Sequence, residues 1–251
     1  ATIKDTPIED FTHEDEIHGL NDTDSVIYQK VEAYASVPMA AISKEVAGLG
    51  GLEALAGTSV SVSGDTCTIL APVVIMDDSS FAAYCGQIGV SPSGTGSVIL
   101  NRIWDSVNSN FRYKEYVPFL TEEQDTILLQ NRDDASASVT IPVLGYTQEP
   151  PVLREEYDNY ALVQFLSVSS WKQIEKVIGN AEQDTYIRVL ATKDRSLTEL
   201  QTIETELTNM LRQEFTLEME NRIQEKTDND AMLNGYQLII GALCALLAMI
   251  G

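Results

Sequence analysis

Residues 73–89, VVIMDDSSFAAYCGQIG, decide the fold class of this chain. The β-branched run Thr66–Ile75 leads into them and predicts a strand that ends before the two aspartates. Either Asp77 or Asp78 can then cap a short helix over Ser79–Gln87, because a carboxylate accepts a hydrogen bond from a first-turn N–H group. A strand that passes directly into a helix indicates that sheet and helices share one core, and we expect an α+β protein.

Further strands are predicted on both sides of this stretch. The run Thr58–Ser63 is also rich in β-branched residues, and Gly64-Asp65 between the two runs is a turn signal. The same criteria predict later strands at Ser97–Asn101, Thr126–Gln130 and Ser138–Gly145.

Two helices are expected before these strands. Apolar residues recur at helical spacing from Asp24, a candidate N-cap, through Tyr34, and Pro38 ends the pattern. A second helical stretch begins at Pro38 and stops at the glycines between Gly48 and Gly51.

The first 24 residues form an acidic N-terminal segment, in which many carboxylates face a single basic residue, Lys4. Like charge at this density predicts a solvated or mobile segment. Within it, His13 and His18 are five residues apart, whereas the metal-binding histidines of H-E-x-x-H lie four apart on one helix face. Neither a metal site nor a Ser-His-Asp hydrolase that recruits one of these histidines is therefore expected.

The last third of the chain alternates strands and helices. The expected elements are a strand at Tyr160–Val168, a helix at Ser170–Gly179, a strand at Thr185–Ala191, a helix capped by Ser196, and a strand around Phe215–Met219. Glu199 follows Ser196 at the spacing of a capping box. The order β-α-β-α-β predicts a small α/β sandwich with some parallel strand pairing.

These patterns predict two loosely divided subdomains with a stiff boundary near Glu149–Pro151. A final helix from about Arg222 leads into the apolar end of the chain. The predicted organisation is an acidic N-terminal segment at 1–24, a first α+β subdomain at 25–150, a second subdomain (β-α-β-α-β) at 151–221, and a stalk helix with the start of a transmembrane helix at 222–251.

The chain ends in the uncharged run Leu238–Gly251, LIIGALCALLAMIG. As a helix that rises ~1.5 Å per residue, this run would span roughly 21 Å, which is short of the ~30 Å hydrocarbon core of a bilayer. We interpret it as the beginning of a transmembrane helix, and a buried C-terminal helix is the alternative. The residues expected in the membrane segment are Tyr236, Leu238, Ile239, Ile240, Leu243, Leu246, Leu247 and Ile250.

Charge and motif content restrict the possible functions. The chain has 16 Lys and Arg against 38 Asp and Glu, a formal net charge of -22, so no basic face for nucleic acid is expected. The sequence contains neither a P-loop nor a G-x-S-x-G motif, and we predict no cofactor, no metal and no catalytic residue. Cys67 and Cys85 could pair in an oxidising compartment, which the sequence leaves open.

A local acidic cluster, Glu155, Glu156 and Asp158, follows the predicted subdomain boundary. In a chain of this net charge, its carboxylates could attract a cation, and a cationic peptide is a candidate ligand. The alternative is a solvated face whose charge is partly offset by Arg154.

Two stretches resemble the FtsX/MacB-like permeases of ABC transporters, in the form found in Gram-positive bacteria. The first is residues 73–89 followed by GSVILNRIWDS at 96–106, similar to a strand, a D-D-x-S-F motif and helix, and a strand that ends in Asn. The second runs from Ser196 to Gly251 and is similar to an amphipathic helix, a strand and a polar helix that enters a membrane span; it ends in ENRIQEKTDNDAMLNGYQLIIGALCALLAMIG at 220–251.

The resemblance implies a large extracellular domain between two transmembrane helices, in a permease dimer that works with a separate cytoplasmic ATPase subunit. It implies the cell membrane, with this domain on the extracellular side and without catalytic residues. Cytoplasmic ATP hydrolysis would drive extracellular motion for export or release of a peptide, antibiotic or lipoprotein. The alternatives are an FtsX-type module that activates a cell-wall hydrolase without transport, and an extracellular enzyme anchored at its C-terminus.

Overall fold

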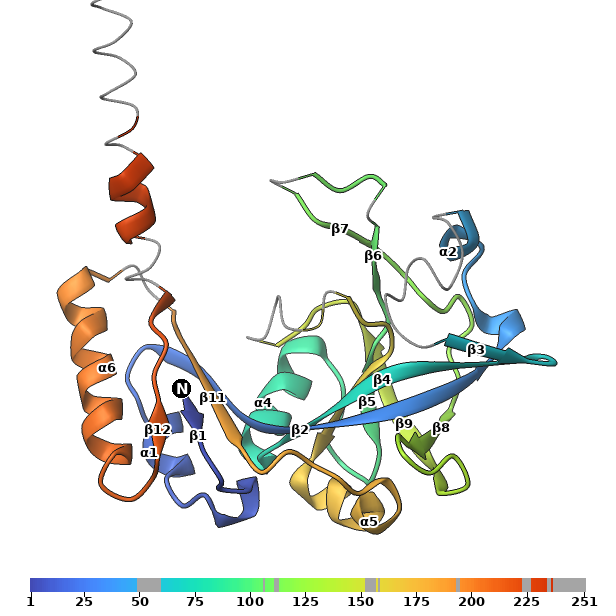
Figure 1. Ribbon diagram of the computed structural model, residues 1–251, viewed down its shortest axis with the longest axis horizontal. Helices are drawn as coiled ribbons and strands as arrows, with labels where there is room; N and C mark the ends of the chain where they lie inside the picture. Colours follow the sequence, from blue (N-terminus) through green and yellow to red (C-terminus); the bar gives the residue numbers. More distant parts are fainter. Residues whose placement is uncertain are drawn as a thin grey trace, which may run out of the picture.

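Six strands close into a barrel-like sheet at the centre of the computed structural model (Figure 1). Around the barrel they follow the order β2, β8, β9, β5, β10 and β4, and β4 pairs back onto β2. Their bounds are β2 Thr23–Pro38, β4 Thr66–Met76, β5 Ser97–Leu100, β8 Thr126–Asn131, β9 Ser138–Thr147 and β10 Val163–Ser167. The pairs β4–β10 and β5–β9 are parallel, and the other four pairs are antiparallel.

The structure describes residues 1–48, 60–105, 107–110, 113–151, 157, 159–192, 195–222, 227–233 and 236. The mixture of helices and strands over these residues confirms the expected α+β class.

The longest strand, β2, is shared between the barrel and a smaller sheet beside it. Its first part pairs with β11 (Thr185–Ala191), and from Tyr28 onward it pairs with β4. β1 (Thr2–Ile3) lies on the far side of β11, and β12 (Leu217–Glu218) pairs with β1 at the edge. The smaller sheet therefore joins strands from the beginning and the end of the chain.

The prediction of a helix from Asp24 to Tyr34 is wrong, because these residues belong to β2. From Val31 to Val37 every second residue is buried and the residues between them are half-buried, which is the period of a strand. The apolar residues before Val31 also fit helical spacing. Pairing with β11, β4 and β8 decides the outcome, because tertiary contacts outweigh local spacing in a segment of β-branched and aromatic residues.

The second helical stretch, expected to begin at Pro38, is confirmed only in part. It consists of the 3-10 turn η2 (Met39–Ala41) and the short helix α2 (Lys44–Gly48). The glycines at 50 and 51, where the stretch was expected to stop, lie outside the described residues.

The hairpin and the capped helix around residues 73–89 are confirmed. β3 (Val60–Ser63) pairs with β4, and Gly64 in the turn has a φ of 58°, which glycine adopts without strain. Asp77 caps α4 (Asp78–Ile88), since its carboxylate accepts from the N–H of Ser80 at 3.3 Å.

The capping signals of the last third are confirmed as well. Ser196 and Glu199 form a reciprocal capping box at the start of α6 (Leu197–Leu211). Ser167, at the end of β10, caps α5 (Val168–Ile178). The expected order β-α-β-α-β is confirmed and β10 pairs in parallel with β4, but the three strands of this unit do not pair with one another: β10 lies between β4 and β5, while β11 pairs with β1 and β2. Spacing along the chain identifies each strand, but the partners of these strands come from distant parts of the sequence.

The expected subdomain boundary falls between β9 and β10, and both strands belong to the barrel. A separate two-stranded sheet of β6 (Ile103–Asp105) and β7 (Glu115–Val117) extends from this body (Figure 1). Residues 227–233 are helical and lie beyond α6, at the opposite end of the molecule from β3 (Figure 1).

Helices cover two different apolar surfaces of the barrel strands. Val74 of β4 joins one buried cluster with Phe81 of α4, while the adjacent Val73 joins a larger cluster with Trp171 of α5. Successive side chains of a strand point to opposite faces, so β4 is buried on both sides. It is therefore a central element of the fold.

The acidic N-terminal segment is part of this core, and the expectation of a solvated or mobile segment is wrong. Ile3, Ile8, Phe11 and Ile17 are buried in the larger cluster. These apolar residues lie in or beside β1, the 3-10 turn η1 (Ile8–Asp10) and the short helix α1 (Glu14–His18). Most of the carboxylates between them remain exposed, so charge and burial alternate within one packed segment.

Gly145 of β9 generates a stability prediction. A Cβ at this position would lie 2.6 Å from the Cγ2 atom of Val90. Gly145→Ala is therefore expected to lower the free energy of unfolding by about 1–3 kcal/mol, because overpacking strains the contact. Val90→Ala removes the opposing methyl groups, and in that background Gly145→Ala should cost less than half as much. Chemical denaturation of the four proteins measures both costs, and an undiminished cost in the Val90→Ala background would contradict the steric explanation.

Candidate functional site

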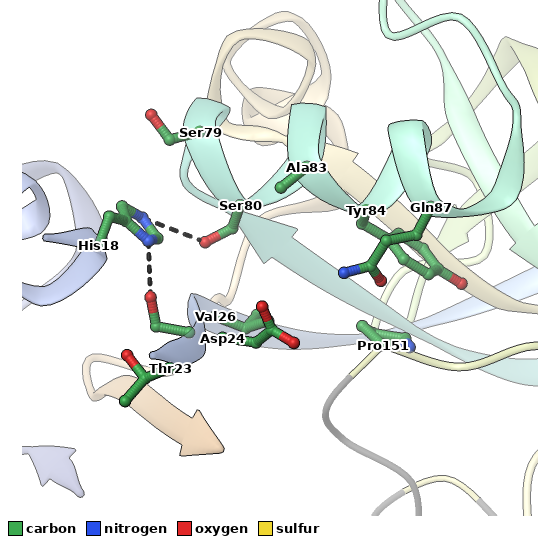
Figure 2. A pocket seen from close by; sticks show the side chains of 11 residues that line it. His18, Thr23, Asp24, Val26, Ser79, Ser80, Ala83, Tyr84, Gln87 and Pro151 are labelled. Atoms are coloured by element: carbon green, nitrogen blue, oxygen red, sulfur yellow. Dashed lines mark hydrogen bonds between the residues drawn. The ribbon is translucent and has the colours of Figure 1, made fainter. Parts of the chain in front are cut away.

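A pocket of about 260 Å³ lies between α1, the beginning of β2 and one face of α4 (Figure 2). His18 closes one side, Ser25 and Ser80 lie beside it, and Asp24 and Gln87 line the rest. The surrounding elements are distant in sequence, so the pocket exists only in the folded protein.

Each polar group reaches the pocket through an ordinary structural device. Ile17 is buried, which anchors the last turn of α1 and turns the neighbouring His18 toward β2 and α4. Ser25 is the third residue of β2. Asp77 follows the last residue of β4, where it begins α4 as the N-cap.

His18 connects these three elements through hydrogen bonds. Its Nδ1 atom lies 2.7 Å from the Oγ atom of Ser25, and its Nε2 atom lies 3.0 Å from the Oδ2 atom of Asp77. An ionised carboxylate can only accept hydrogen bonds, so Nε2 carries a hydrogen. In the neutral imidazole, Nδ1 is then the acceptor for the hydroxyl of Ser25.

Asp77 is held in place by further contacts. Besides the N–H of Ser80, its carboxylate accepts a hydrogen bond from the hydroxyl of Ser80. The Ser80 oxygen accepts in turn from the N–H of Ile27 at 3.1 Å. The carboxylate of Asp77 is therefore oriented from several sides and fixes the plane of the His18 ring.

The hydrogen bond to Asp77 raises the pKa of His18, and partial burial of the ring opposes this effect. The carboxylates of Glu14 and Asp15 raise the pKa further through their charge. The pKa of His18 therefore lies above the ordinary value for histidine.

The far wall of the pocket is rich in hydrogen-bond acceptors. Figure 2 shows the carboxylate of Asp24 and the amide of Gln87 turned toward the space between β2 and α4. Tyr84 donates its hydroxyl hydrogen to the carbonyl oxygen of Glu149 at 2.7 Å, and burial raises the pKa of this phenol. Within the described part of the chain, the Asp24 carboxylate has no hydrogen-bond or ion-pair partner.

The sequence identified several of these residues but not their relationship. Asp77 was expected as a helix cap, and this is confirmed. His18 was considered only with His13, which lies elsewhere, 3.3 Å from Glu214 and between Phe11 and Phe215. Ser25 carried no signal at all, because a serine next to an acidic segment is unremarkable until the fold is known.

The other sequence expectations meet the structure as follows. Asp78, the alternative candidate for the helix cap, does not serve as the cap, and its carboxylate accepts a hydrogen bond from the hydroxyl of Ser169 at 2.6 Å. Cys67 and Cys85 are both buried and unpaired, so the disulfide left open by the sequence does not form. Among the described residues, no group of His, Cys, Asp and Glu side chains could hold a metal ion.

Two candidate sets fall largely outside the described residues. They are the acidic cluster Glu155, Glu156 and Asp158, and the membrane segment from Leu238 to Ile250. Tyr236 is described and is 58% exposed. Within the described ranges, no helix has the length and apolar character needed to cross a bilayer.

Comparison with known proteins returned no match among protein-family models, curated proteins or solved structures.

The pair of His18 and Asp77 generates a pH prediction. Because folding raises the pKa of His18, its stabilising contribution is complete below the unfolded pKa of ~6.5 and is lost as the pH rises through the folded value. His18→Gln should therefore destabilise the protein by about 1 kcal/mol more at pH 5.5 than at pH 8.5, a modest effect because solvent screens the partly exposed pair.

Asp77→Asn is the matched control, because asparagine preserves the helix cap while removing the charge. In that background, the pH dependence of the effect of replacing His18 should be much smaller, because only the weaker influence of Glu14 and Asp15 remains. Denaturation midpoints at both pH values measure the difference. A cost of His18→Gln that is the same at pH 5.5 and 8.5 would show that the two side chains are not coupled by charge.

Proposed function

We propose that this chain is the extracellular domain of an ABC transporter permease of the FtsX/MacB type. In this role it transmits motion driven by a cytoplasmic ATPase subunit to the outside of the cell, for export or release of a peptide, antibiotic or lipoprotein. The order of motifs from residue 73 to residue 106 and from residue 196 onward supports the proposal. A domain of this type is inserted between two membrane helices, so its chain must enter and leave at one place.

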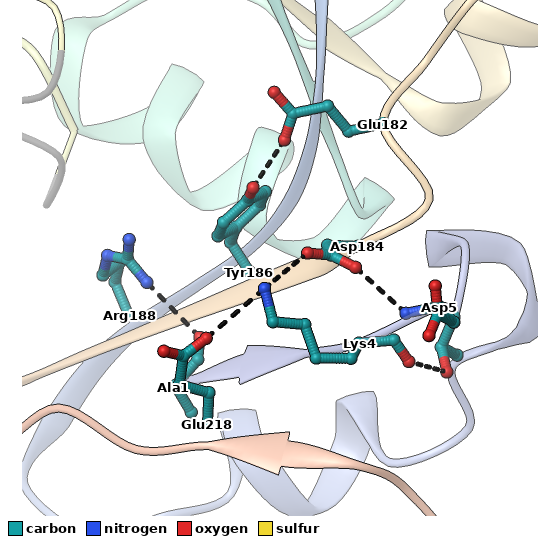
Figure 3. A network of polar contacts seen from close by, with 9 residues as sticks. Ala1, Lys4, Asp5, Glu182, Asp184, Tyr186, Arg188 and Glu218 are labelled. Carbon is teal, nitrogen blue, oxygen red and sulfur yellow. Dashed lines mark hydrogen bonds and ion pairs between the residues drawn. The ribbon is translucent and has the colours of Figure 1, made fainter.

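The pairing of β1 with β12 is the observation that carries the proposal. Thr2 lies opposite Glu218 in an antiparallel pair, so residues from the two ends of the folded body are neighbours. Lys4 strengthens this edge, with its Nζ atom 2.9 Å from Asp184 and 3.3 Å from Glu218 (Figure 3). These contacts raise the pKa of Lys4, and Lys4 in turn lowers the pKa of Asp184.

The segment after β12 has the properties of a polar stalk. Residues 227–233 are helical, and every one of their side chains is exposed. We propose that this helix continues through the exposed Tyr236 into the apolar residues from Leu238 to Ile250, which would then lie in the membrane.

Further properties belong to the same proposal. The permease works as a dimer in the cell membrane. The acidic cluster Glu155, Glu156 and Asp158, in a chain with a net charge of -22, attracts a cationic peptide or a partner of the cell envelope.

The extracellular position can be tested by cysteine labelling in intact cells. Ser93 lies in an exposed loop, so Ser93→Cys in the full-length protein should react with a membrane-impermeant maleimide without lysis. Cys67 and Cys85 are both 0% exposed and should not react under native conditions. Replacing Cys244 by Ser in all variants removes the remaining thiol.

Reaction of Ser93→Cys only after lysis would place the domain inside the cell and contradict the proposal.

Copurification distinguishes a transporter permease from an FtsX-type module that activates a cell-wall hydrolase. Capture of a cytoplasmic ATPase together with a cell-wall hydrolase would favour the regulatory module, and capture of the ATPase without a hydrolase would favour the transporter.

The stalk generates a second expectation. Of the described residues beyond 222, which are 227–233 and Tyr236, none belongs to either buried cluster. Ending the chain after Leu233 should therefore leave the melting temperature unchanged within about 2 °C and reduce self-association, because an apolar run without lipid favours contact with its own kind. Thermal unfolding and light scattering measure both quantities, and loss of folding would mean that the removed residues belong to the core.

A further inference from the structure

The side chains around the pocket have the connectivity of a serine hydrolase. We propose that Ser25 is the nucleophile of a carboxylic-ester hydrolase site in which His18 is the general base and Asp77 is the positioning residue. This activity goes beyond transmission of motion and does not depend on it. The sequence argued against such a site because His18 appeared to lie in a mobile segment, and the structure instead packs His18 between Ser25 and Asp77.

The base is oriented correctly for proton transfer. Asp77 accepts from Nε2, which leaves the lone pair of Nδ1 directed at the Ser25 hydroxyl 2.7 Å away. A nucleophile, a base and an orienting carboxylate in this order are the general signature of an activated serine. In the chymotrypsin-like proteases, Nε2 faces the serine and Nδ1 faces the carboxylate. Here the two nitrogens are reversed, and the proton transfer from serine to histidine is the same.

Ser25 is accessible from the pocket. Ser25 lines the pocket, so an ester can reach its Oγ atom. Ser79 and Ser80 from the first turn of the 11-residue helix α4 line the same pocket.

The lining of the pocket indicates the substrate class. A volume of about 260 Å³ accommodates a small acyl group. The carboxylate of Asp24 lies on the far wall without a partner among the described residues. An ester whose acyl part carries an ammonium group, such as an α-amino acyl ester, would place that charge against Asp24.

The reaction proceeds in two balanced halves. The Ser25 oxygen attacks the ester carbonyl carbon while its proton moves to Nδ1 of His18, the bond to the alcohol oxygen breaks, and that oxygen takes the proton. Water then attacks the acyl-serine carbonyl and gives a proton to His18, and the Ser25 oxygen leaves and recovers it. The products are a carboxylic acid and an alcohol, and the paired Asp77 stabilises the imidazolium formed in each half.

A fluorophosphonate probe tests the nucleophile directly. The Ser25 oxygen should displace fluoride from phosphorus, and mass spectrometry of the intact chain and its peptides should find one adduct on Ser25. Ser25→Ala should abolish labelling, and His18→Gln should slow it by about 100-fold or more. Ser93→Ala is the control, because this exposed serine lies outside the pocket lining and its replacement should leave the rate unchanged.

Circular dichroism and thermal unfolding establish that each variant is folded. With folded protein, absence of an adduct overturns the proposal, as does an adduct on another residue or labelling that persists at the same rate in His18→Gln. Such results would leave the three side chains as a structural connection between α1, β2 and α4.

The role of Asp77 has a signature that a structural role would not produce. The labelling rate of the wild-type protein should rise with pH as His18 loses its proton. In Asp77→Asn the midpoint of this profile should move to lower pH, because the group that raises the pKa of His18 is gone. An unchanged midpoint would exclude Asp77 as the positioning residue.

A pair of esters tests the substrate class. The 4-nitrophenyl esters of alanine and of isobutyric acid have nearly the same shape, and only the first carries an ammonium group. The alanine ester should be hydrolysed with a kcat/KM about fivefold higher, and Asp24→Asn should remove this preference. Equal values for the two esters in the wild-type protein would overturn the assignment of the acyl group to Asp24.

Discussion

The double pairing of β2 is the constraint on which the rest of the structure depends. This single strand of 16 residues pairs with β11 in its first part and with β4 from Tyr28 onward, and β8 pairs with its second part on the edge opposite β4. The barrel and the smaller sheet therefore cannot change their relative orientation without breaking a continuous ladder. Burial on alternate positions adds a second restriction, because a shift in register by one residue would expose every core side chain from Val31 to Val37.

The sequence predicts helix caps and turns correctly where the residues that form them are close neighbours in the chain. The cap at Asp77, the capping box of Ser196 and Glu199, and the turn at Gly64 all depend on residues within three positions, and all are confirmed. The helix expected from Asp24 to Tyr34 failed because spacing alone did not reveal that two distant strands would pair with this segment. The same limit applies to β10 and β11, whose partners are not each other.

The candidate site was hidden for a related reason. His18 and Asp77 are 59 positions apart, and no periodic pattern connects them. The charge of the N-terminal segment indicated exposure, whereas the four buried apolar residues from Ile3 to Ile17 determine its place. An acidic composition describes the outside of a segment and says little about which side chains its short helices bury. One carboxylate at Asp77 then serves two purposes, because the group that begins α4 also holds the imidazole.

The antiparallel pairing of β1 and β12 has a mechanical consequence. Thr2 lies opposite Glu218 and Ile3 opposite Leu217, so the outer ends of both strands are at the same side of the pair. A force that pulls these two ends apart would break the hydrogen bonds between the strands one after another, rather than load all of them at once in shear. The edge would then yield at low force while the closed barrel remained intact. A force that moves both ends in the same direction does not strain the β1–β12 pair, and the folded body then moves as a rigid unit. A force that separates the two ends acts on this pair first.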